Sequence, residues 1–236
     1  MFNAYITNLG KYNAGELCGE WLSLPATKED VQGLLGRIAV DGVIYEETFI
    51  TDYDIDINGL ARRLGEYESL DELNYLAARI AAMDYWERER FKAAIELGEH
   101  SASVKELINL TYNLNCYEFF PDVEDDDDLG RYLVEDMEFE EIPERLEQYF
   151  DYEAYGRDFI SSAGGDFVGG GYAYRNGERF TEHYSGMGDI PDEYRIFYYP
   201  APPDKMPVKQ QLQMYSKMAQ LREALPDKAE PELAQR

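Results

Sequence analysis

Apolar and polar residues alternate near the start of the chain, with the period of a half-buried β-strand. Three stretches alternate in this way or are rich in β-branched and aromatic residues, and we expect strands at residues 2–8, 18–25 and 43–56. The glycines and asparagine of LGKYNAGE, which follows the first stretch, are typical of a turn or loop. Thr27 and Asp30 have the spacing of a helix cap, which predicts a helix just behind them. The pattern predicts a small α+β unit.

The next fifty residues change to helical spacing, with apolar residues three or four positions apart. Each of three such segments follows a pair of residues with the spacing of a helix cap: Ser69 with Glu72, Asp84 with Glu87, and Ser103 with Glu106. Gly98 separates the second segment from the third. We therefore expect a small helical bundle here.

The third part of the chain predicts a strand at residues 115–122 and two helices. The first helix is expected over residues 126–136, and the second begins at Pro143, because proline is favoured in the first turn of a helix. Gly156 is expected to end the second helix.

The remaining residues are rich in glycine and tyrosine before they regain a helical pattern. Residues 167–184 predict a hairpin with Asn176-Gly177 as its turn, and residues 208–225 predict an amphipathic helix. We therefore expect an α+β protein with the following division: an α+β domain at 1–61, a helical domain at 62–112, an acidic α+β domain at 113–162, and an extension at 163–236 that contains a hairpin, a helix and a frayed tail.

The charge is large and uneven. The chain has 48 acidic and 22 basic residues, and its net charge of −26 comes almost entirely from residues 1–160, which carry 37 acids and 13 bases. Nucleic acid and anionic membranes should repel such a surface, so the expected partner is cationic. No apolar run is long enough to span a membrane, and the start does not resemble a signal peptide. Two cysteines predict neither a disulfide framework nor a zinc site, which favours a cytoplasmic protein.

The motifs for metal binding and catalysis are incomplete. Residues 54–59 match the first half of an EF-hand calcium loop, but Gly65 stands where the loop requires glutamate, and a strand rather than a helix comes before it. There is no P-loop and no G-x-S-x-G, and His100 and His183 lie in no recognisable motif. We therefore predict no enzyme activity, no metal site and no cofactor.

The acids are densest between Pro121 and Phe150, where thirteen occur with only two arginines. B-DNA carries one charge per ~1.7 Å of its axis, so 24 net charges correspond to ~40 Å of duplex. Acids one helical turn apart, ~5.4 Å, roughly reproduce the spacing of phosphates. These residues could therefore present to a basic groove negative charges with roughly the density and spacing of DNA phosphates.

Three blocks of sequence resemble the ArdA family of antirestriction proteins, in the family's order: AYITNLGKYNAGELCGEWLSLP, SLDELNYLA and IPERLEQYFDYEAYGRDF. The resemblance implies a cytoplasmic inhibitor, carried by mobile genetic elements, that occupies the DNA-binding groove of type I restriction–modification enzymes as a DNA mimic. It also implies an elongated array of three small domains, α+β, helical and α+β, and a homodimer formed through the third. The extension at 163–236 lies beyond the three blocks.

The candidate partner-binding residues are the acids that could act as phosphate surrogates. They are Asp122, Glu124, Asp125, Asp126, Asp127 and Asp128, then Glu135, Asp136, Glu138, Glu140, Glu141, Glu144 and Glu147, with Asp52, Asp54, Asp56, Glu66 and Glu68 as an extension. Tyr155, Gly156, Arg157 and Asp158 are the residues of the family block, and we expect Arg157 to pair with a nearby acid. Three alternatives stay open: an acidic adaptor or inhibitor of another basic DNA-binding protein, a calcium-binding protein, and an enzyme whose site lies in the extension at 163–236.

Overall fold

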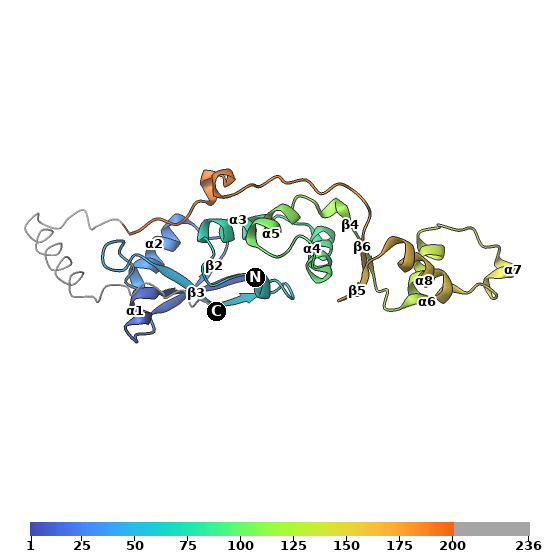
Figure 1. Cartoon of the computed structure of the whole chain (residues 1–236), viewed down its shortest axis with the longest axis horizontal. Helices are drawn as coiled ribbons and strands as arrows, with labels where there is room; N and C mark the ends of the chain where they lie inside the picture. Colours follow the sequence, from blue (N-terminus) through green and yellow to red (C-terminus); the bar gives the residue numbers. More distant parts are fainter. Residues whose placement is uncertain (201–236) are drawn as a thin grey trace, which may run out of the picture.

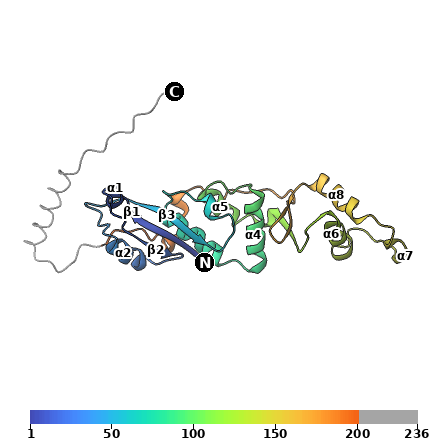
Figure 2. The same cartoon turned by 90° about the horizontal axis from the view of Figure 1, so that it is seen from below.

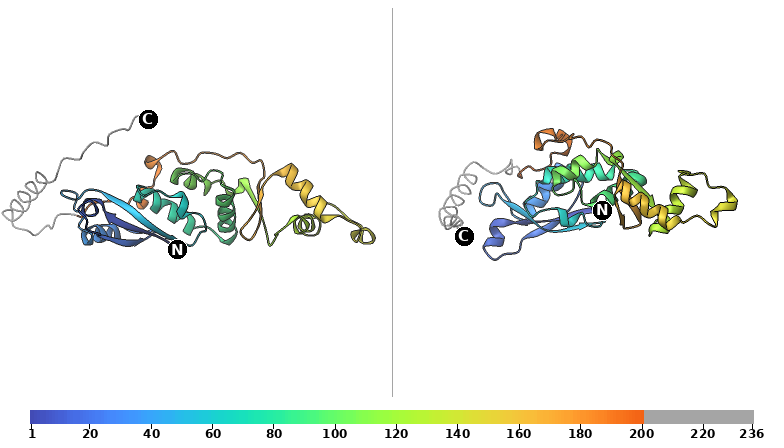
Figure 3. Two further views of the ribbon diagram at one scale, coloured as in Figure 1. Left: turned by 60° about the horizontal axis from the view of Figure 1, so that its bottom comes forward. Right: turned by 45° about the vertical axis from the view of Figure 1, so that its right-hand side comes forward.

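The computed structural model describes residues 1–200, with only the backbone for Glu144. The fold is α+β, and its parts follow one another in an elongated row (Figure 1). The row stays narrow when it is viewed from below (Figure 2) and at intermediate angles (Figure 3). None of the helices within residues 1–200 is long and apolar enough to cross a membrane. The helix predicted at 208–225 lies outside the described residues.

The N-terminal part is a three-stranded antiparallel sheet with a helix packed against it. Its elements are β1 (Phe2–Asn8), α1 (Leu9–Asn13), β2 (Gly19–Ser23), α2 (Lys28–Arg37) and β3 (Thr48–Ile55), and the strand order is β2-β1-β3. Thr27 and Asp30 cap α2 reciprocally, as the sequence predicts. The predicted loop after β1 contains the short helix α1, because the Asn8 side chain accepts a hydrogen bond from the backbone of Lys11 and caps it.

The middle of the row consists of three helices, as predicted: α3 (Leu70–Ala81), α4 (Tyr85–Leu97) and α5 (Val104–Leu110). Ser69, Asp84 and Ser103 cap them through side-chain oxygens. The cap is reciprocal at Asp84, whose backbone N–H donates a hydrogen bond to the Glu87 carboxylate. Gly98 ends α4 in the left-handed conformation, which only glycine adopts readily.

The far end combines a second antiparallel sheet with three helices. Its elements are β4 (Tyr117–Pro121), α6 (Asp126–Arg131), α7 (Glu144–Glu147), α8 (Tyr152–Ala163), β5 (Asp166–Val168) and β6 (Gly171–Arg175), and the strand order is β4-β6-β5. A π-helical turn, Tyr132–Asp136, continues α6. We refer to residues 117–175 as the acidic end.

Two predictions about this end are wrong. The helix expected from Pro143 to Gly156 is divided into α7 and α8, and Gly156 lies inside α8 rather than at its end. The hairpin turn is at Gly169-Gly170, because Val168 pairs with Gly171. Asn176 instead bonds the backbone of Cys116 and Asn115.

The acidic end is an excursion from the main body. The chain leaves the body after Cys116 and returns at Asn176, whose N–H lies 3.1 Å from the Cys116 carbonyl oxygen. The expected boundary at 162/163 therefore falls at the last residue of α8, and the two strands that follow belong to the same sheet as β4. The acidic end has its own small core, built on Phe120, Leu129 and Tyr172.

The main core runs continuously through the N-terminal part and the helical part. It also contains Tyr184, Ile190 and Ile196, which come from the last described segment. This segment, residues 176–200, turns back over the helices toward α2 (Figure 1), and we call it the strap. Its only regular elements are the 3-10 turns Met187–Asp189 and Asp192–Tyr194.

Candidate partner-binding surface

The negative charge lies mainly at the two ends of the row. The acidic end has 18 acids and four arginines, a net charge of −14. Residues 1–61 have ten acids and three bases, whereas residues 62–112 have ten acids and seven bases. The helical middle is therefore close to electrical balance, and the acidic end dominates the field of the molecule.

The acid run folds because the start of α6 uses several of its carboxylates. Asp125 accepts a hydrogen bond from the Asp128 N–H at 2.9 Å, and Asp128 accepts one from the Glu124 N–H at 3.2 Å. Asp126 and Asp127 lie in the first turn with Asp128, where the positive end of the helix dipole stabilises negative charge. Local structure thus offsets part of the repulsion.

Arg131 balances two further acids. It lies 2.7 Å from the Asp127 carboxylate, 3.6 Å from that of Glu135, and over the ring of Tyr152. The hydrogen bond that Arg131 donates to Asp127 raises the pKa of the Arg131 guanidinium. Across residues 1–200, by contrast, no ion pair involves Asp122, Glu124 or Asp126. Within this range, no cationic side chain therefore pairs with these three acids.

The second group of predicted surrogates lies on and around the tip that carries α7. Glu138, Asp136, Glu140, Glu141, Glu147 and Glu135 are all exposed. Glu144 is the first residue of α7. Three of these acids, Glu135, Glu140 and Glu147, line a hollow of about 170 Å³ beside Tyr152. Burial raises the pKa of the Tyr152 phenol, with a further contribution from Glu135. Within the described chain, no group of acids, histidines or cysteines is arranged to hold a metal ion.

The tip also exposes apolar side chains that the sequence reasoning missed. They are Met137, Phe139, Leu146 and Tyr149. Tyr149 is the most open, with 78% of its surface accessible. A phosphate backbone has no equivalent of such residues, so they point to a contact of a different kind. Leu146 and Tyr149 belong to the second predicted helix, from Pro143 to Gly156. Because that helix is divided into α7 and α8, both residues lie outside the small core of the acidic end.

The N-terminal acids occupy a different surface. Asp52 and Asp54 lie on β3 opposite Tyr5 and Asn3 of β1, and both are exposed. Asp56, just beyond β3, lies 2.5 Å from the N-terminal ammonium and 2.7 Å from Arg88. The hydrogen bond from the N-terminus, together with Arg88, lowers the pKa of Asp56. Asp56 is therefore an ion-paired structural residue.

Glu66 and Glu68, the other two acids predicted near the N-terminal sheet, also differ in whether the fold uses their carboxylate. Glu66 is exposed, whereas Glu68 accepts a hydrogen bond from the Gly65 N–H at 2.9 Å. The predicted surrogates thus form two groups, at the N-terminal sheet and at the acidic end, with the helical part between them (Figure 2).

The family block lies in α8 and sets how this helix packs on α6. A methyl carbon added to Gly156 would lie 2.0 Å from the Asp126 carbonyl oxygen, and one added to Gly130 would lie 2.0 Å from that of Tyr152. Two glycines therefore allow α6 and α8 to meet backbone to backbone. The sequence reasoning missed Gly130, because its neighbour in space is distant in sequence.

The other residues of the block have separate positions. Tyr155 packs edge-on against Phe150, and Asp158 is exposed. Arg157 lies 2.8 Å from Glu153, which confirms that it pairs with a nearby acid.

A family model for antirestriction proteins (ArdA) matches residues 4–174. The chain belongs to the ArdA family. The match begins in β1 and ends in β6, so it covers both sheets, all three helices of the middle and every predicted surrogate of this ArdA chain. The strap lies beyond the matched residues. The comparison with curated proteins gave no match.

Proposed function

We propose that this ArdA chain is a DNA mimic that blocks type I restriction–modification enzymes by occupying their DNA-binding groove. The observation that carries the proposal is the dense set of exposed carboxylates at one end of an elongated chain of the antirestriction family. A groove that binds DNA presents lysines and arginines, which attract carboxylates as they attract phosphates.

The charge of the acidic end is on the scale of a short duplex. At one charge per ~1.7 Å, a net charge of −14 corresponds to ~24 Å of B-DNA, and two copies correspond to ~50 Å. The elongated shape keeps the two charged ends apart, which limits their mutual repulsion. Binding makes and breaks no covalent bond and needs no cofactor, and we infer that it occurs in the cytoplasm.

The residues have graded roles in this mechanism. Asp122, Glu124 and Asp126 contact the basic groove first, because no ion pair compensates their charge. The exposed acids of the tip extend the contact: Asp136, Glu138, Glu140, Glu141 and Glu147. Asp125 and Asp128 hold the start of α6, and Asp127 and Glu135 share Arg131.

We infer further that two copies associate through the acidic end. The exposed apolar residues of the tip support this inference, because burying them would remove apolar surface from water. A homodimer would double the length of the mimic.

Phage infection provides the test. Unmodified phage should plate with higher efficiency on a host with a type I restriction system when the chain is produced. A variant with Glu124→Lys, Glu140→Lys and Glu141→Lys should lose most of this protection, because it reverses three exposed charges of the acidic end.

The matched control has the same change in total charge elsewhere, at Glu29→Lys, Glu178→Lys and Glu193→Lys, which are also exposed. It should retain protection. Equal loss in both folded variants would mean that total charge matters and the acidic end does not. If wild-type chain gives no protection but captures another basic DNA-binding protein, the target is a different one.

A further inference from the structure

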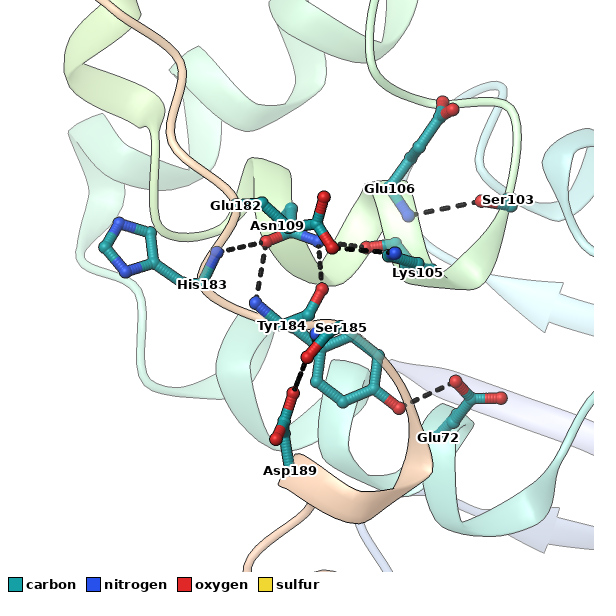
Figure 4. Close-up of polar contacts among 10 residues, drawn as sticks. All are labelled: Glu72, Ser103, Lys105, Glu106, Asn109, Glu182, His183, Tyr184, Ser185 and Asp189. Atoms are coloured by element: carbon teal, nitrogen blue, oxygen red, sulfur yellow. Dashed lines mark hydrogen bonds and ion pairs between the residues drawn. The ribbon is translucent and has the colours of Figure 1, made fainter.

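The strap lies outside the residues that match the family model, and yet it is part of the folded body. Tyr184, Ile190 and Ile196 are at most 3% exposed and pack in the core shared by the N-terminal and helical parts. Tyr184 also donates a hydrogen bond to Glu72 of α3, 2.7 Å away (Figure 4). A segment with no structural role would not supply three side chains to this core.

Two asparagines, one on α5 and one just beyond it, bind the backbone of the strap as a neighbouring strand would. Asn109 on α5 accepts hydrogen bonds from the N–H groups of His183 and Tyr184 and donates one to the Tyr184 carbonyl, at 2.7–2.9 Å (Figure 4). Asn113, one turn further on, accepts from the Thr181 N–H and donates to its carbonyl. Both asparagines are buried, so losing these bonds would leave buried polar groups unpaired.

Helix α3 continues this set of contacts toward the N-terminal part. Asp71 accepts hydrogen bonds from the N–H groups of Ile196 and Phe197 at 2.7 and 2.8 Å. Asn74 donates to the Tyr194 carbonyl and accepts from the Ala26 N–H at 2.7 Å. Ala26 precedes α2, so the Asn74 amide joins the strap, α3 and the N-terminal part at one point.

The end of the strap contacts the N-terminal part directly. The Tyr199 hydroxyl donates to the Glu46 carbonyl at 2.8 Å, and its ring lies against Gly42 so closely that a methyl group there would clash. The Lys28 ammonium at the start of α2 lies 4.6 Å from the centre of the Tyr198 ring. The strap therefore spans from the base of the acidic end, at Asn176, to the loop before β3.

We propose that the strap is a brace that fixes the N-terminal sheet on the helical part. The spacing between the acids of β3 and those of the acidic end is then set by the segment beyond the family match. The structural role of the strap does not depend on the proposed function. Its effect on inhibition of a type I enzyme rests on that function.

Hydrogen exchange of the wild-type full chain is the first test. The amides of His183, Tyr184, Ile196 and Phe197 should exchange at least tenfold more slowly than the amide of Gly177, which lies in an exposed turn. Equally fast exchange at all five positions would overturn the brace, and this measurement requires no variant.

The second test releases the strap in the full chain. Asn109→Ala with Asn113→Ala should speed exchange across residues 181–197 at least tenfold and leave the acidic end unchanged. Small-angle X-ray scattering should then report a broader distribution of distances within the molecule. Asn115→Ala is the matched control, since this neighbouring asparagine is exposed and its side chain makes no hydrogen bond within the described residues.

A released strap with an unchanged scattering profile would overturn the brace. The inhibition of a type I enzyme by the same variants is measured in a separate assay. The variant with the released strap should inhibit more weakly than the control. Absence of inhibition by the wild-type chain would instead contradict the proposed function and leave the scattering result intact.

Discussion

At the scale of single residues, carboxylates with the same chemistry have different roles because they have different partners. Asp125 binds a backbone N–H at the start of α6, Asp56 binds two cations, and Glu124 extends into solvent. Only the last kind is free to meet a basic partner at no structural cost. Counting acids therefore overestimates the number of phosphate surrogates.

Replacing Asp125 by alanine should destabilise the fold. The change removes the N-cap of α6, and such a loss costs about 1 kcal/mol. Glu124→Ala is the control, because its side chain caps nothing, and it should change the free energy of unfolding by less than about 0.5 kcal/mol. Urea unfolding of both variants measures the difference. Equal stabilities would mean that Asp125 does not act as a cap.

The ion pairs of Asp56 predict how stability depends on pH. Folding lowers the pKa of Asp56, so the contribution of this residue to stability is complete above its ordinary pKa of 3.8 and is lost as the pH falls further. Asp56→Asn should therefore make the stability curve less steep below about pH 4. Asp54→Asn, which removes no ion pair, should leave that part of the curve unchanged. The same slope in both variants would contradict the role given to Asp56.

Sequence predicts contacts between near neighbours well and contacts between distant segments poorly. The caps at Thr27 and Asp84 and the pairing of Arg157 follow from residues three or four positions apart. The pairing of Asp56 with the N-terminus and Arg88 depends on a fold that brings residues 1, 56 and 88 together. No local pattern contains that information.

At the scale of elements, the closest packing in the acidic end is that of α6 on α8. A glycine inside a helix usually weakens it, and that expectation led to the prediction that Gly156 ends its helix. The structure gives the opposite reason for this glycine: it allows another backbone to approach. In the same way, Asn176-Gly177 has the composition of a hairpin turn, but Asn176 is held by residues 115 and 118.

Gly156→Ala should destabilise the acidic end. The added methyl group would overlap the Asp126 carbonyl, and overpacking of this kind costs about 1–3 kcal/mol. Gly36→Ala on α2 is the matched control, since no atom lies within 4 Å of its added carbon. That change should stabilise the protein by about 0.5–1 kcal/mol, because alanine favours a helix. Denaturant unfolding of both variants checks the signs, and a stabilised Gly156→Ala would contradict the close contact of α6 and α8.

At the scale of the whole molecule, shape and charge act together. The acidic end has its own core, but its sheet is also held on the body, since the Gly169 N–H donates to Glu96 of α4 and Arg175 pairs with Glu99. Its helices extend away from the body and carry the dense charge (Figure 1). The sequence predicted the α+β class, the order of the parts and the uneven charge. It did not predict the return of the chain as a strap, because no local pattern marks Asn109 on α5 or Asn113 just beyond it until the segment that they bind is in place.

Competition with DNA is the most direct measurement of the central claim. A purified type I enzyme is titrated with labelled duplex DNA at several fixed concentrations of the chain, at about 50 and 200 mM salt. DNA mimicry predicts that DNA and the chain exclude each other, and that the affinity of the enzyme for the chain falls at least tenfold at the higher salt as charge attraction is screened. A stable complex that contains enzyme, DNA and chain together, or an affinity that does not change with salt, would contradict it.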